Sequence, residues 1–99
     1  MEIRELQAHA QELRSQQGWQ DTSLERRLAF LLSEMGEVAQ EVLTLMAASG
    51  ETEREQAKMA LGLEIYDVFW NLCDLANLVG LDLEEAFNKK YAINQQRTW

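Results

Sequence analysis

Four acidic residues stand in parts of the sequence that are otherwise apolar. Glu34 and Glu37 lie three residues apart among Leu, Met and Val, and Glu64 and Asp67 repeat this spacing further along. Residues three apart on a helix are separated by about 60° around the axis and about 4.5 Å along it, so each pair can point at one object. Carboxylates suit Mg2+, which commonly binds substrate phosphates as well. The four acids therefore predict a metal site for phosphate chemistry, with Mg2+ as the expected ion and Mn2+ as a substitute.

The alternative is that these acids lie on a solvated helix face, because this spacing is also common by chance. Gly36 favours the metal site, since a glycine inside a helix costs about 1 kcal/mol relative to alanine and so indicates close packing or a nearby ligand. A di-iron carboxylate bundle would also use paired acids, but it requires Glu-x-x-His on two helices. The single histidine, His9, has no such partner, and this class is set aside.

Composition limits the partners of the chain. Its 99 residues include 17 acidic residues against nine Lys and Arg, which gives a net charge of -8. This charge repels nucleic acids and anionic membranes, so we expect neither as a partner. The single cysteine, Cys73, forms no intrachain disulfide and fits a reducing, cytoplasmic setting. The N-terminal segment is too polar for a signal peptide, and no run reaches the roughly 18 apolar residues of a membrane span.

The chain lacks proline and is rich in good helix formers, which predicts an all-α, four-helix bundle-like domain spanning residues 1–99. Apolar spacing predicts helices over about 2–16, 22–48, 59–79 and 82–93, the third being the most buried. Capping-box patterns support helix starts at Thr22–Glu25 and Asp82–Glu85. The polar segment 49–58 is linker-like, although Thr52–Glu55 leaves an earlier start of the third helix open. A domain of this length has a thin core, so we expect a homo-oligomer.

The segments around the acids resemble the MazG-like nucleotide pyrophosphohydrolases of the all-α NTP pyrophosphatase superfamily. LSEMGEVAQE, residues 32–41, is similar to the first family motif, EExxE, and LEIYDVFW, residues 63–70, is similar to the second, ExxD. The stretch GLDLEEA, residues 80–86, followed by Lys90, Asn94 and Arg97, is similar to the closing segment of the family. This resemblance covers most of the chain and implies that the metal ligands are Glu34, Glu37, Glu64 and Asp67. Ser33 departs from the pattern, because the first glutamate of EExxE usually stands there, and the number of Mg2+ ions is left open.

The resemblance implies an enzyme that cleaves a nucleoside triphosphate between its α- and β-phosphates and releases the monophosphate and pyrophosphate. House-cleaning of noncanonical or surplus dNTPs is the expected purpose, and small members with the same closing segment favour pyrimidine deoxynucleotides. Mg2+ would neutralise phosphate oxygens and lower the pKa of a water, with Glu34, or else Glu37, accepting its proton. The resemblance also implies a homodimer or homotetramer, because family active sites are commonly completed across subunits.

Substrate binding is expected of four residues. Lys90 and Arg97 are cations that could engage the phosphates, and Asn94 could contact sugar or phosphate; the alternative for the cations is a solvated helix end. Trp19 follows Gly18 in a polar loop, where its ring could stack on a nucleobase or simply plug the end of the bundle.

Other interpretations of the sequence also remain open. Trp70 is interpreted as packing, and Asn71 and Asp74 continue the face of Glu64 and Asp67 with no firm role. Two alternatives to an enzyme also remain. One is a non-catalytic helical oligomerisation module whose acids are surface charges or a structural cation site, and the other is a sensor that binds nucleotide without hydrolysis.

Overall fold

The computed structural model describes residues 2–19 and 21–98, which form helices and no strand, in keeping with the all-α prediction. The described helices are α1 (Ile3–Gln16), α2 (Leu24–Ala47), α3 (Glu51–Leu78) and α4 (Leu83–Gln95). Within residues 2–19 and 21–98, no helix combines the length and apolar character that a membrane crossing requires.

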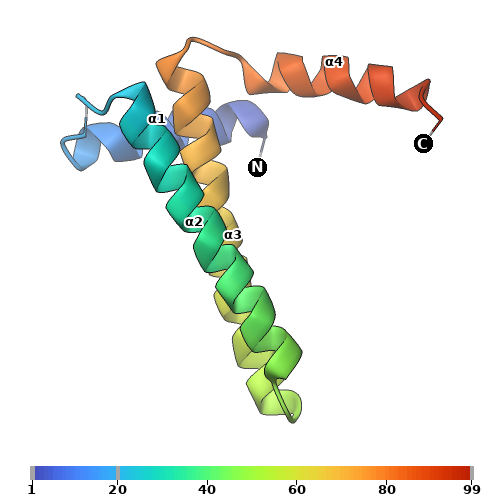
Figure 1. Cartoon of the computed structure of the whole chain (residues 1–99). Coiled ribbons are helices and arrows are strands. Elements are labelled where there is room, and N and C mark those ends of the chain that lie inside the picture. The colour runs from blue at the N-terminus through green and yellow to red at the C-terminus, as the bar shows by residue number, and fades with distance from the viewer. Residues whose placement is uncertain (1, 20, 99) are drawn as a thin grey trace.

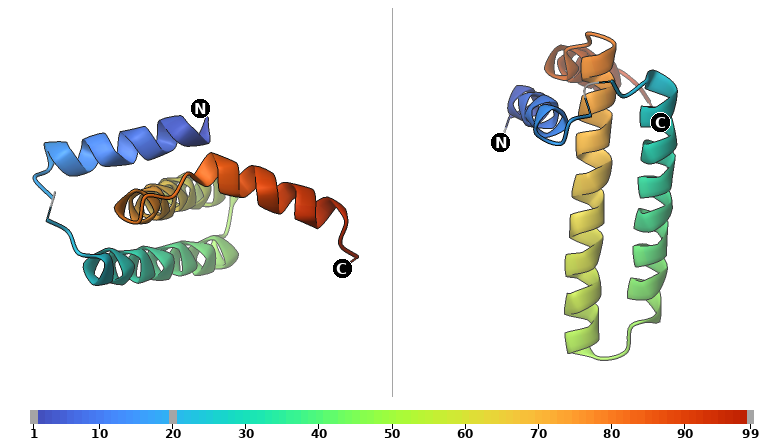
Figure 2. Two further views of the ribbon diagram at one scale, coloured as in Figure 1. Left: turned by 90° about the horizontal axis from the view of Figure 1, so that it is seen from above. Right: turned by 90° about the vertical axis from the view of Figure 1, so that its left-hand side faces the viewer.

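The two long helices form an antiparallel hairpin (Figure 1). They are joined by the short connection Ala48–Gly50, in which Gly50 has a φ of 90°, a conformation that glycine adopts without steric cost. Seen along the hairpin, α3 lies between α1 on one side and α2 on the other (Figure 2). This arrangement brings the acidic segments of α2 and α3 side by side.

The start of α2 differs by one residue from the prediction. Ser23, not Thr22, is the N-cap, and its hydroxyl accepts the N–H of Arg26 at 3.1 Å. The Thr22 hydroxyl instead donates to the Trp19 carbonyl at 2.7 Å, which closes the loop before the helix. The capping box predicted at Thr22 is therefore wrong, because its side chain is used within the loop.

The polar segment 49–58 is not a linker. It belongs to α3 from Glu51 onward, with Gly50 rather than Thr52 at the N-cap position. The Glu53 carboxylate accepts the backbone N–H of Ser49 at 2.6 Å and so ties the first turn to the preceding connection. Polar residues are compatible with helix here because the first turns of α3 are exposed.

At the other end of α3, the chain turns at Gly80, where φ is 70°. The Leu81 N–H then donates to the Ala76 carbonyl at 2.9 Å. Asp82 caps α4 as predicted, since its carboxylate accepts the N–H groups of Glu84 and Glu85 at 3.0 and 3.3 Å.

The core of the chain is small. The buried apolar side chains among the described residues are Ala10, Ala57, Cys73 and Ala76. The helix α3 carries most of the buried positions, as its composition predicted. The helix α4 extends away from the hairpin and packs chiefly on α1, so the helices do not close into a bundle within one chain (Figure 1).

Candidate functional site

Three of the four predicted metal ligands converge where α2 faces α3. Glu34 and Glu37 of α2 and Glu64 of α3 each offer a carboxylate oxygen that lies within 4.8 Å of the others. Glu34 and Glu64 are half-buried, and Glu37 is exposed. Asp67 is not part of this group; it is half-buried and lies three residues after Glu64 on α3.

The pKa values of two acids of this cluster, Glu34 and Glu64, are raised. Hydrogen bonding to Glu37, followed by burial and the charges of the neighbouring acids, raises the pKa of Glu64 to about 7. Burial, followed by the charge of Glu37, raises the pKa of Glu34 above its usual range. Ionised carboxylates held this close repel each other unless a proton or a cation lies between them.

The donor set fits a hard divalent cation. One oxygen of Glu34 and one of Glu64 are shielded from solvent and accept no hydrogen bond from the described residues. Buried carboxylate oxygens without a donor are costly unless a cation compensates their charge. An all-oxygen set of this kind suits Mg2+ or Mn2+ better than a softer metal. Glu34, Glu37 and Glu64, with Asp67 beside them, would hold such an ion.

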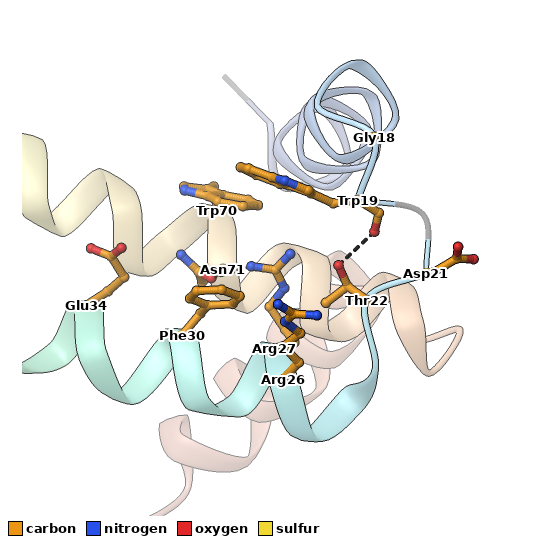
Figure 3. Close-up of a pocket in the computed structure, with 10 residues that line it drawn as sticks. All are labelled: Gly18, Trp19, Asp21, Thr22, Arg26, Arg27, Phe30, Glu34, Trp70 and Asn71. Carbon is orange, nitrogen blue, oxygen red and sulfur yellow. Dashed lines mark hydrogen bonds between the residues drawn. The ribbon is translucent and has the colours of Figure 1, made fainter.

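A cavity of about 370 Å³ opens next to this cluster, between the loop after α1 and the adjoining ends of α2 and α3. Glu34 lies at one end and Asp21 at the other, with aromatic, cationic and polar side chains between them (Figure 3). The full lining is Gly18, Trp19, Asp21, Thr22, Arg26, Arg27, Phe30, Glu34, Trp70 and Asn71. This volume lies within the range of ordinary small-molecule sites.

Two tryptophans stack at this cavity. The rings of Trp19 and Trp70 lie nearly parallel, with their centroids 6.0 Å apart and their planes at 18° (Figure 3). The Arg27 guanidinium lies 4.8 Å from the Trp70 ring centroid and 5.8 Å from that of Phe30. Trp19 therefore lines the cavity, where its stacking on a nucleobase stays a prediction, and Trp70, which was interpreted as packing, lines it too.

Arg27 is a cavity residue that was not predicted from the sequence. This residue is only 2% exposed and donates to the Asn71 side-chain oxygen at 2.6 Å. It also pairs with Asp74, which is fully buried. The sequence contains an indication of its burial, because Arg27 lies three residues after Leu24 and four before Leu31, on the predicted apolar stripe of its helix. A cation at such a position indicates either a buried partner or a ligand.

The remaining predicted residues are not brought to this site within one chain. Lys90 and Asn94 lie on α4 and Arg97 follows it, and none of the three lines the cavity or belongs to the carboxylate cluster. The reason is the course of α4, which leaves the end of α3 and extends away from the hairpin (Figure 1). Lys90 and Arg97 are exposed, and Asn94 is half-buried.

Comparison with family models and with curated proteins finds no match to this chain.

Proposed function

We propose that this protein is a Mg2+-dependent nucleoside triphosphate pyrophosphohydrolase that cleaves a (d)NTP to the (d)NMP and pyrophosphate. In this proposal it removes noncanonical or surplus dNTPs, with pyrimidine deoxynucleotides as the preferred class. The observation that carries the proposal is that Glu34 belongs to the carboxylate cluster and also lines the aromatic cavity. A ligand in the cavity would therefore have its reactive end beside a cation held by the acids.

The acids would have two roles in the reaction, metal binding and proton acceptance. When bound, Mg2+ supplies charge neutralisation of the phosphates and lowers the pKa of a water. Glu34, Glu37, Glu64 and Asp67 would hold the ion, and Glu34, or else Glu37, would accept the proton of the attacking water. Glu34 suits this role because burial raises its pKa, which makes its carboxylate a better proton acceptor than an ordinary exposed glutamate.

The cavity suits the nucleoside part of the substrate. Trp19 and Trp70 offer flat apolar faces on which a nucleobase can stack. Stacking of this kind is available to every base, because each base has a π-face. Arg26 and Arg27 place positive charge at the same cavity in a chain whose net charge is -8. Asp21 and Glu34 line the cavity as well, so the two guanidiniums offset these acids and leave the cavity less acidic than the chain as a whole.

We propose that the working unit is a homodimer or homotetramer. The accessible surface is 7351 Å², whereas a monomer of this mass typically exposes about 5,800 Å². The radius of gyration is 16.2 Å, compared with about 13 Å for a compact domain of this length. Large side chains such as Leu32, Met46 and Leu63 are more than 60% exposed, and a second copy would cover them.

In this assembly, α4 of one copy would bring Lys90, Asn94 and Arg97 to the carboxylate cluster of another. The cations would engage the phosphates, and Asn94 would contact sugar or phosphate. Analytical ultracentrifugation tests the assembly. We expect a dimer or tetramer at micromolar concentration, and a stable monomer would contradict this part of the proposal.

The test of the activity is pyrophosphate release from a panel of NTPs and dNTPs, with and without Mg2+. We expect release only with the metal. Glu37→Gln should lower the rate by about 100-fold or more, because a metal ligand supports several kcal/mol of transition-state stabilisation. Glu12→Gln is the matched control, since Glu12 is an exposed glutamate of α1 away from the cluster, and it should leave the rate unchanged.

Two results would contradict the enzyme. Equal rates for the wild type and Glu37→Gln would remove the metal cluster from the reaction. No release from any nucleotide, with nucleotide still binding, would instead favour the sensor. If neither hydrolysis nor nucleotide binding is detected, the oligomerisation module is the better description.

A further inference from the structure

A buried ion-pair network lies behind the cavity and joins three helices. Asp74 of α3 is fully buried, and its two carboxylate oxygens face guanidinium groups from two other helices. Arg14 Nε of α1 lies 3.1 Å from Oδ1, and an Arg27 terminal nitrogen of α2 lies 2.8 Å from Oδ2. The arginine side chains are 14% and 3% exposed, so solvent screens these pairs little.

One branch of the network reaches the cavity through Arg27. Its second terminal nitrogen donates to the Asn71 side-chain oxygen, and its guanidinium lies against the Trp70 ring. Figure 3 shows the three side chains next to one another, with Arg27 coming from α2 and Asn71 and Trp70 from α3. Asp74 therefore fixes the cation that supports one aromatic ring.

The other branch reaches the cavity through Arg14. The Arg14 carbonyl accepts the backbone N–H of Trp19 at 2.8 Å, at the turn where α1 ends. Asp74 thus holds the helix end from which the second ring extends. Each of the two stacked rings, Trp19 and Trp70, is connected to Asp74 through one arginine.

Charge explains why a carboxylate is needed at this position. Two buried guanidiniums face a single carboxylate, and a neutral residue in place of Asp74 would leave two like charges close together. The arginines would then separate or turn toward solvent. Loss of the Arg14 contact would free the end of α1 from which Trp19 extends, and loss of the Arg27 contact would withdraw the guanidinium from the Trp70 ring, so either change alters the placement of the two rings.

We propose that Asp74 is a positioning residue that sets the geometry of the Trp19–Trp70 pair through Arg14 and Arg27. Its effect on kinetics rests on the proposed function, whereas its effect on the rings does not. Asp74 belongs neither to the carboxylate cluster nor to the cavity lining, so it acts on the substrate only through the rings. Its loss should therefore weaken nucleotide binding more than it slows the chemical step.

The experiment uses the full chain with Asp74→Asn. The first readout is the exciton signal of the stacked tryptophans in circular dichroism, assigned by its loss in Trp19→Phe and in Trp70→Phe. The second is the split between KM and kcat for pyrophosphate release. We expect the exciton signal to disappear, KM to rise about tenfold or more, and kcat to change by less than about threefold.

A second variant distinguishes a loss of ring positioning from a loss of the fold. Asp74→Asn leaves two buried cations unpaired, which can prevent folding. Arg14→Met removes one ion pair and keeps the pair between Asp74 and Arg27, and we expect the same changes in smaller measure. The matched control is Arg4→Met, because Arg4 pairs with Asp82 and Glu84 and so also ties α1 to another helix, but away from the cavity.

The folded variants at Asp74 and Arg14 decide whether the positioning role holds. An unchanged exciton signal and KM in folded Asp74→Asn or Arg14→Met would overturn the proposal, and so would equal effects of Arg4→Met. If Asp74→Asn and Arg14→Met both fail to fold, the network serves folding alone and the proposal is also overturned. If the wild type hydrolyses no nucleotide but the exciton signal depends on Asp74, the positioning role stands and the enzyme does not.

Discussion

Divalent cation binding should release protons from the carboxylate cluster, in an amount that depends on pH. Metal ligation requires ionised carboxylates, whereas the close approach of Glu37 raises the pKa of Glu64 to about 7 in the metal-free protein. From that pKa, the Glu64 carboxyl holds about 0.9 proton at pH 6 and about 0.1 proton at pH 8. Binding at pH 6 should therefore release about 0.9 proton from Glu64.

The same competition should weaken the affinity at low pH. With a pKa of about 7, proton competition at Glu64 raises the apparent Kd for Mg2+ by about tenfold between pH 8 and pH 6. Calorimetric titration with MgCl2 measures both quantities, because the observed enthalpy in buffers of different ionisation enthalpy gives the number of protons released. Glu64→Gln serves as the control, since it should bind Mg2+ more weakly and release about 0.9 proton less at pH 6.

The sign of the matching stability effect follows from the same pKa. Because the folded pKa of Glu64 exceeds its unfolded value, the metal-free fold holds more protons than the unfolded chain between about pH 4 and pH 7. Its stability should fall as pH rises through this window and level off above it, and Glu64→Gln should flatten the profile.

Equal proton release at pH 6 and pH 8, or an affinity that does not change with pH, would refute the convergence of these acids on one ion.

Two further predictions concern helix ends. Ser23→Ala should lower the free energy of unfolding by about 1 kcal/mol, because the Arg26 N–H loses its acceptor. Thr52→Ala should change the free energy of unfolding little, since Thr52 does not cap α3. Urea unfolding of the two variants measures both changes, and equal losses would contradict the assignment of the caps. Asp82 pairs with Arg4, which lowers the pKa of its carboxyl, so this pair should stabilise the fold above about pH 4 and be lost as pH falls below that value. Asp82→Asn should weaken this acid dependence in thermal melts at pH 3 to 6, and an unaltered profile would show that the pair has no influence on stability.

The helices were largely predictable because local chemistry decides them. The apolar spacing, the absence of proline and the glycines at positions 18, 50 and 80 locate the helices to within a few residues at most ends. The exceptions arise where tertiary or loop contacts use the capping side chains. Thr22 bonds to the Trp19 carbonyl, and Glu53 bonds to Ser49, and neither partner is visible in a helix-start pattern.

The site was predictable in part. The three-residue spacing of Glu34 and Glu37, and of Glu64 and Asp67, predicted a site formed by four acids, of which the structure brings the first three together. The role of Trp70 was not predicted, because an aromatic residue within an apolar run is ordinarily packing. Whether such a ring meets another ring depends on the path of a loop more than 50 positions away in the chain.

The sequence by itself determined an acidic, all-helical chain that places carboxylates at three-residue spacing on two long helices, because composition and periodicity act within a few residues. Only the tertiary structure decided that Trp19 stacks on Trp70, that Asp74 holds Arg14 and Arg27, and that α4 extends away from the carboxylates. These features depend on contacts between distant segments, where burial and opposite charge select one arrangement among many that the same local pattern permits.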